Sequence, residues 1–209
     1  MTILGLPENK KVFHELVTAY EEPCRYYHTL AHLENCLVRF DEVKDLLQSP
    51  EEVELALWFH DVVYDPHSTT NESDSAVWLK HFLESGDRPL IQINRVYSHI
   101  LATQYHYKVT DSDRQFMLDI DLAILGSTAA EFRKFELNIR REYAWVSQET
   151  YCRKRVEVLQ SFFGYAERVN SWRSPIYQTD YFREHYEAQA EQNVAQAITS
   201  LQEGRLEAK

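Results

Sequence analysis

The apolar stretch Leu55–Tyr64 constrains the fold of this chain more than any other feature. Its density of large apolar side chains predicts a buried helix, yet it contains the adjacent polar residues His60 and Asp61. A buried imidazole and a buried carboxylate each cost several kcal/mol unless they have partners. A hydrogen bond between the two at a helix end would satisfy them. A divalent metal ion would do so equally well, because both groups are good metal ligands.

The rest of the chain predicts an all-α protein. Apolar residues recur at helical spacing, and predicted helices cover about 7–20, 33–40, 49–61, 76–82, 90–101 and 116–126, then one or two long helices over 128–163 and a last one from Tyr186. Ser49 is the predicted N-cap of the helix that carries His60 and Asp61, and Gly126 is a predicted C-cap. Only 5 Gly and 6 Pro occur in 209 residues, and no alternating strand pattern is present. We expect one helical bundle over 1–209, with a C-terminal helical extension from about 128.

The net charge limits which partners the chain can bind, and the cysteine content indicates its cellular compartment. The chain has 22 Lys and Arg against 33 Asp and Glu, a net charge of −11 that repels nucleic-acid backbones. Its 3 scattered cysteines form no Cys-x-x-Cys pair and indicate neither a thiolate zinc site nor a disulfide framework. No apolar run reaches membrane-spanning length and no signal peptide is recognisable, so we expect a soluble, cytoplasmic protein without membrane contact. The oligomeric state stays open, a homo-oligomer included.

Further polar side chains fall within the apolar patterns on either side of His60. His32 begins an apolar helical face, and His28 lies four residues earlier, on the same side if both are helical. Asp119 and Asp121 are embedded in the apolar run over 116–126. Residues two apart on a helix point roughly 200° apart, so both cannot easily face one ion, and spacing alone does not choose between them. Two imidazoles and two carboxylates suit a divalent ion such as Mn, Mg, Fe, Co, Ni or Zn.

The order of these residues resembles a known family. His32, then the pair His60-Asp61, then Asp121 in an Asp-x-Asp-Leu segment is similar to the metal-binding signature of the HD superfamily of predicted metal-dependent phosphohydrolases. Flanking segments resemble a small bacterial branch of that superfamily, over 25–32, 58–65, 71–76, 100–106 and 118–126, and weakly over 140–143 and 176–193. The resemblance implies a helical bundle with one divalent ion between central helices, bound by His32, His60, Asp61 and Asp121.

The resemblance also implies a reaction, the metal-assisted hydrolysis of a nucleotide or another small phosphoester. Asp61 would bind the ion and orient the attacking water, while His28 or His106 would contact the substrate and protonate the leaving oxygen. Arg25 is a candidate for neutralising the phosphate.

Other interpretations of these residues stay open. His28 could be a helix-start residue bonded to backbone, and His106 a loop residue in water. Asp119 is interpreted as a solvent-facing or Arg-paired carboxylate, and His99 as a core histidine. The remaining histidines are interpreted as surface residues: His14, His67, His81 and His185.

Two functions of other classes compete with hydrolysis. One is a non-catalytic sensor that binds a metal ion or a nucleotide. The other is an oxygen-activating di-iron enzyme, which would need His28, His99 or His106 at a second iron. A metal-free helical scaffold is a further alternative, in which no metal ion would satisfy the buried polar residues.

Overall fold

The computed structural model describes residues 9–163 and 175–205. Within these ranges the regular structure is entirely helical, with nine α-helices and two short 3-10 helices, which confirms the all-α class. None of the helices in the described ranges is both long enough and apolar enough to cross a membrane. The chain separates into two compact units, Met1–Asp121 and Leu122–Lys209, which are described separately. Organisation as a single domain stays a prediction.

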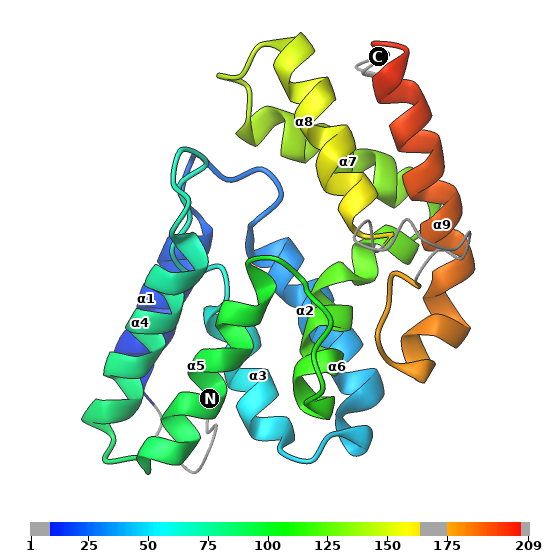
Figure 1. Cartoon of the computed structure of the whole chain (residues 1–209). Helices are drawn as coiled ribbons and strands as arrows, with labels where there is room; N and C mark the ends of the chain where they lie inside the picture. Colours follow the sequence, from blue (N-terminus) through cyan, green and yellow to red (C-terminus); the bar gives the residue numbers. More distant parts are fainter. Residues whose placement is uncertain (1–8, 164–174, 206–209) are drawn as a thin grey trace. The chain divides into compact units, whose positions relative to one another are not determined.

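Helix α3 is the central helix of the first unit. In the described residues this unit contains α1 Lys10–Tyr20, α2 Leu30–Val43, α3 Pro50–Phe59, α4 Asn71–Ser85, α5 Leu90–Thr103 and α6 Ser112–Asp121 (Figure 1). Helix α3 contacts α2, α4, α5 and α6, and its buried side chains therefore lie on several faces: Val53, Leu55, Ala56, Leu57 and Phe59. The apolar stretch forms the core because it is apolar on more than one side.

The start of α3 depends on a residue from another helix. Pro50 occupies the first turn as predicted, and Ser49 holds the N-cap position, but the Ser49 side chain makes no capping hydrogen bond. Instead the Asp113 carboxylate accepts the backbone N–H groups of Gln48 and Ser49, both at 2.8 Å. A carboxylate at this position also interacts favourably with the helix dipole. Asp113 thereby joins α6 to α3.

Helix α3 ends earlier than predicted. It stops at Phe59, so His60 is its C-cap and Asp61 lies in the following turn rather than within the helix. The carbonyl groups of Asp61 and Val62 accept hydrogen bonds from Arg25, at 2.6 and 3.0 Å. These long-range bonds stabilise a turn that helical periodicity does not predict.

Helix α1 is capped at its N-terminus by Asn9, whose side chain accepts the Val12 N–H at 3.1 Å. The predicted start of this helix near Pro7 lies outside the described residues. Helix α5 covers the predicted range 90–101 and ends two residues later, at Thr103.

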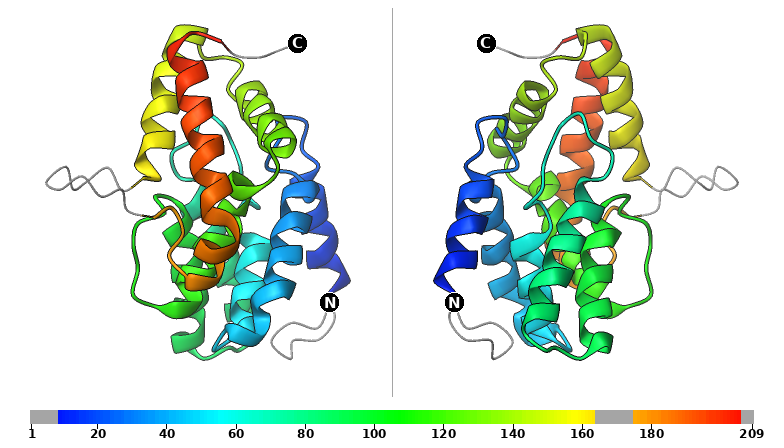
Figure 2. Two further views of the ribbon diagram at one scale, coloured as in Figure 1. Left: turned by 90° about the vertical axis from the view of Figure 1, so that its right-hand side faces the viewer. Right: turned by 90° about the vertical axis from the view of Figure 1, so that its left-hand side faces the viewer.

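The second unit contains α7 Ala129–Glu142, α8 Gln148–Ser161 and α9 Asp180–Gln202 in its described residues, after the short 3-10 helix η2 Leu122–Gly126. The range 128–163 therefore forms two helices. Helices α8 and α9 run side by side (Figure 2). Helix α9 begins at Asp180, earlier than predicted, because the Thr179 side chain accepts the Phe182 N–H and caps it.

The helical run ends at Gly126 as predicted, but Gly126 does not adopt the left-handed conformation. A helix C-cap glycine usually has a positive φ, but Gly204 is the glycine with that conformation in the described residues. A Cβ atom at Gly126 would lie 2.7 Å from both the Cβ and the carbonyl oxygen of Tyr186. Glycine is required here because η2 approaches α9 closely.

Candidate metal centre

Four side chains from three segments of the first unit converge on one point. His32 lies in the first turn of α2, His60 and Asp61 follow the last residue of α3, and Asp121 is the last residue of α6. The Nε2 atoms of His32 and His60 are 3.1 Å apart. Asp61 Oδ2 lies 3.3 and 3.1 Å from these two nitrogens. Asp121 Oδ1 lies 3.3 and 3.5 Å from them.

These separations match those of ligands that share one ion. Two atoms bonded to an ion at about 2.1 Å lie roughly 3.0 Å apart at an octahedral angle and roughly 3.4 Å apart at a tetrahedral angle. The observed distances of 3.1 to 3.5 Å lie close to these values. The imidazoles are almost fully buried, whereas the Asp61 and Asp121 side chains remain 17% and 14% exposed. His32, His60 and Asp121 belong to a buried group that could bind a metal ion, whereas Asp61 as a ligand stays a prediction.

The orientation of His60 suits a ligand. Its Nδ1 atom lies 2.8 Å from the carbonyl oxygen of Leu57. Because a carbonyl can only accept, Nδ1 carries the proton, and in the neutral ring Nε2 then presents a lone pair to the cluster. Metal-binding histidines usually have such a partner on the other ring nitrogen.

Asp121 faces the histidines of the cluster. Its second oxygen, Oδ2, lies 2.9 Å from Nε2 of His106, so His106 contacts a cluster residue rather than standing in water. His106 reaches this position with a positive φ of 50°, a conformation that few non-glycine residues adopt. Asp119 is 1% exposed, so its interpretation as a solvent-facing carboxylate is wrong.

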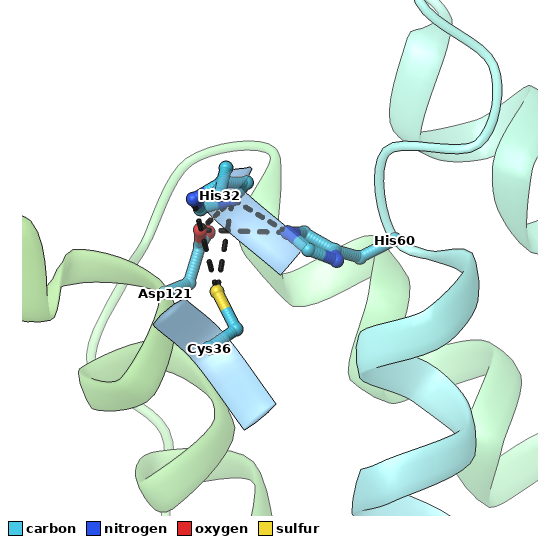
Figure 3. Close-up of side chains that lie close together, drawn as sticks. All are labelled: His32, Cys36, His60 and Asp121. Atoms are coloured by element: carbon cyan, nitrogen blue, oxygen red, sulfur yellow. Dashed lines mark hydrogen bonds and ion pairs between the residues drawn. The ribbon is translucent and has the colours of Figure 1, made fainter. Parts of the chain in front are cut away.

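Cys36 was missed by the sequence interpretation, which found no thiolate site. It lies one turn after His32 on α2, and its sulfur belongs to a group with His32, His60 and Asp121 whose candidate ligand atoms all lie within 4.8 Å of one another (Figure 3). The sulfur is 3.8 Å from Nδ1 and 3.7 Å from Nε2 of His32. It therefore lies beside the imidazole ring, not along the direction of the Nε2 lone pair. Cys36 nevertheless belongs to the group whose atoms could hold a metal ion.

The charges of the cluster shift the pKa values of its members in opposite directions. Burial lowers the pKa of His32 and of His60, but nearby groups, including Asp61 and Asp121, outweigh burial, and both pKa values rise well above 6.5. Burial raises the pKa of each carboxyl group, but the adjacent histidines lower both pKa values well below 3.8. Protons on the histidines thus compensate the carboxylates when no cation is bound, and a metal ion must displace them.

This competition predicts the pH dependence of metal binding. We expect Mn²⁺ to raise the melting temperature more at about pH 8 than at about pH 6. A raised histidine pKa stabilises the metal-free fold below the ordinary value of 6.5, and this contribution is lost as the pH rises through the folded-state pKa. Metal binding strengthens over the same interval because the protons leave. Thermal melts with and without Mn²⁺ at both pH values measure the difference, and a larger shift at the acidic pH would contradict it.

Arg25 bonds the backbone of the metal centre, and its side chain is fully buried. Its guanidinium donates to the backbone carbonyls of Asp61, Val62 and His28, at 2.6, 3.0 and 3.1 Å, and to the Glu22 carboxylate at 3.1 Å. The expected contact of Arg25 with a phosphate stays a prediction. The observed contacts hold the backbone on which Asp61 is placed.

His28 precedes α2 and is therefore not helical, so the same-face argument does not apply to it. Its ring nevertheless lies 5.9 Å from the ring of His32, centroid to centroid. It stacks on Tyr64 at 4.3 Å. Burial raises the pKa of Asp61, but the charge of His60 and then that of His28 lower it. These observations place His28 beside the cluster.

Glu72 is a second residue for which sequence analysis assigned no role. It lies in the first turn of α4. Burial raises the pKa of Glu72, and the charges of Asp61 and Asp121 raise it further, whereas His106 lowers it. Glu72 thus stands in the electrostatic field of the cluster. The loop before α4 is closed by Asn71, which exchanges two hydrogen bonds of 3.0 Å with the backbone of Asp65.

The remaining histidines are not members of the group of candidate ligands. His99 is 3% exposed and is a core histidine as predicted, although its Nδ1 has no hydrogen-bond partner. The four histidines interpreted as surface residues are exposed: His14, His67, His81 and His185.

No protein-family model matches this chain, and neither a curated protein nor a solved structure is found to be similar to it. The resemblance to the HD superfamily stays a prediction based on the residues quoted above.

Proposed function

We propose that this chain is a metal-dependent phosphohydrolase of the HD type that acts on a nucleotide or another small phosphoester in the cytoplasm. The observation that carries the proposal is the set of distances of 3.1 to 3.5 Å among His32, His60, Asp61 and Asp121. A divalent ion held by these atoms would supply an activated water and polarise a phosphoryl oxygen. Four protein ligands leave positions open on a six-coordinate ion.

The surrounding side chains have the chemistry that hydrolysis needs. Asp61 has one oxygen in the cluster and is partly exposed, so it can orient a water that approaches from solvent. His106 contacts Asp121 through Nε2 and is half-buried, so it can donate a proton at the solvent side of the cluster. His28 is a second candidate for protonating the leaving oxygen, since its ring lies beside that of His32. Glu72 adds a carboxyl group with a raised pKa.

The test of this function is a phosphoester screen with the purified chain and Mn²⁺, Mg²⁺, Fe²⁺, Co²⁺, Ni²⁺ or Zn²⁺. We expect turnover with at least one ion, and we expect Asp61→Asn to reduce it at least about 100-fold, because the amide is a poor ligand and cannot act as a base. Asp65→Asn makes the same chemical change at an exposed residue outside the cluster and is expected to keep full activity.

Two outcomes of the screen would favour a different function. Stoichiometric metal without turnover of any phosphoester would favour a metal-binding or nucleotide-binding sensor. Two irons per chain and consumption of oxygen would favour a di-iron enzyme, for which His106 and His28 are the nearest additional imidazoles. Undiminished turnover in Asp61→Asn would exclude the proposed site.

A further inference from the structure

Two exposed tyrosines flank His106 in the segment between α5 and α6. Tyr105 is 62% exposed and Tyr107 is 71% exposed. Their rings nevertheless stack, with centroids 5.3 Å apart and an interplanar angle of 18°. Large aromatic rings normally bury most of their area, so a stacked pair that remains this exposed offers a flat surface on which another aromatic ring can stack.

The tyrosine pair adjoins in sequence the histidine that contacts the metal centre. The positive φ of His106 accompanies its inward direction, and its Nε2 lies 2.9 Å from Asp121 Oδ2. Consecutive Cα atoms are about 3.8 Å apart, so the backbone of each tyrosine lies directly beside that of His106. A ligand that contacts the cluster and extends outward past His106 would reach their rings.

A third tyrosine lies close in sequence to the other histidine that stands beside the cluster. Tyr26 is 48% exposed and precedes His28 by two residues. Both segments that bring an additional histidine to the centre therefore also present aromatic rings to solvent. Exposed tyrosines thus neighbour, in sequence, both histidines that stand beside the polar cluster.

We propose that Tyr105 and Tyr107 form a stacking platform for the base of a nucleoside monophosphate, whose phosphate lies at the metal centre. The inference rests on the proposed phosphohydrolase function and narrows its substrate class. A nucleobase has a flat, uncharged face that stacks on tyrosine without any positive charge from the protein. This suits a chain with a net charge of −11, in which the phosphate would be recognised by the cation and the base by the aromatic pair.

Comparison of two ligands isolates the contribution of the base. Adenosine 5′-monophosphate and ribose 5-phosphate both carry a ribose 5-phosphate group, but the second lacks the base. In the Mn²⁺-loaded full chain we expect the nucleotide to have a KM about 5- to 10-fold lower, the lower part of the range for stacking on one aromatic platform. In the double variant Tyr105→Ala/Tyr107→Ala, the KM of the nucleotide should rise to that of ribose 5-phosphate, while kcat changes little.

Two further variants show whether the effect depends on these rings. Tyr105→Phe/Tyr107→Phe keeps the stacking faces and should retain the preference for the nucleotide. Trp145→Ala removes an aromatic side chain with a similar exposed fraction, 56%, from the second unit and should change neither KM. Equal KM values for the two ligands in the wild-type chain, or an equal loss for both in the alanine double variant, would overturn the proposal.

The experiment separates this inference from the proposed function. If neither compound is hydrolysed, the screen of other phosphoesters decides whether the phosphohydrolase proposal fails. Calorimetric dissociation constants for the same two compounds then decide whether the tyrosine pair binds a base: a nucleotide preference that the alanine double variant removes supports the platform, and the absence of a preference excludes it.

Discussion

Replacement of His60 by alanine is expected to abolish metal binding by this chain. His60 is 1% exposed, and its Nε2 atom lies within 3.5 Å of an atom of each of the other three candidate ligands. Loss of a partner that merely orients a ligand weakens metal affinity roughly 10- to 100-fold, and loss of a ligand itself should weaken it more. Mn²⁺ at about 100 times its dissociation constant should stabilise the wild-type chain by about 2.7 kcal/mol and His60→Ala by close to zero. Calorimetric titration and thermal melts with Mn²⁺ measure both effects.

A second buried histidine provides the matched control. His99 lies in the same unit, is 3% exposed, and is absent from the group of candidate ligands. His99→Ala makes the same truncation at a comparable depth, so it lowers stability through a cavity but should leave the Mn²⁺ response intact. A folded His60→Ala chain that binds Mn²⁺ as tightly as wild type would show that the four side chains do not share an ion.

Helix positions follow from the sequence because they depend on periodicity within one segment, whereas helix ends depend on distant residues. Helix α5 lies where its apolar spacing predicts it. The end of α3 differs because Arg25, which is 36 residues before Asp61, bonds the carbonyl that would otherwise continue the helix. The cap at its start likewise comes from Asp113, 64 residues after Ser49. No local pattern encodes these bonds.

The candidate ligands were identifiable because each interrupts an apolar pattern. Choosing Asp121 over Asp119 needed the direction of the last turn of α6, which spacing alone does not provide. Cys36 carried a local signal, since it lies four residues after His32 on one helix and four-residue spacing puts side chains on one face. The cysteines were considered only for a thiolate zinc site or a disulfide framework, so Cys36 received no role. Glu72 carried no such signal because a loop separates it from Asp61.

Replacement of Arg25 by methionine is the second change expected to have a large effect. Methionine can fill the volume beside Tyr20 and Tyr64, whose rings lie 5.3 Å from the guanidinium carbon, but it donates no hydrogen bond. Three backbone carbonyls then lose a donor, at about 1 kcal/mol each, so we expect a loss of about 3 kcal/mol in the free energy of unfolding. For a chain of this size that corresponds to a fall of roughly 6 to 12 °C in the melting temperature.

The same variant separates a structural role of Arg25 from a role in binding phosphate. If the guanidinium positions the Asp61 backbone, Arg25→Met lowers stability and metal affinity together, and Arg25→Lys restores little because an ammonium cannot reproduce the planar array of donors. If it instead neutralises a substrate phosphate, KM rises while the melting temperature is unchanged. Arg39→Met removes a 30% exposed arginine paired with Glu42 at 2.9 Å, and should change stability by at most about 1 kcal/mol. Because the Arg25 side chain is fully buried and its donors contact four oxygen atoms of the chain, we expect the first result.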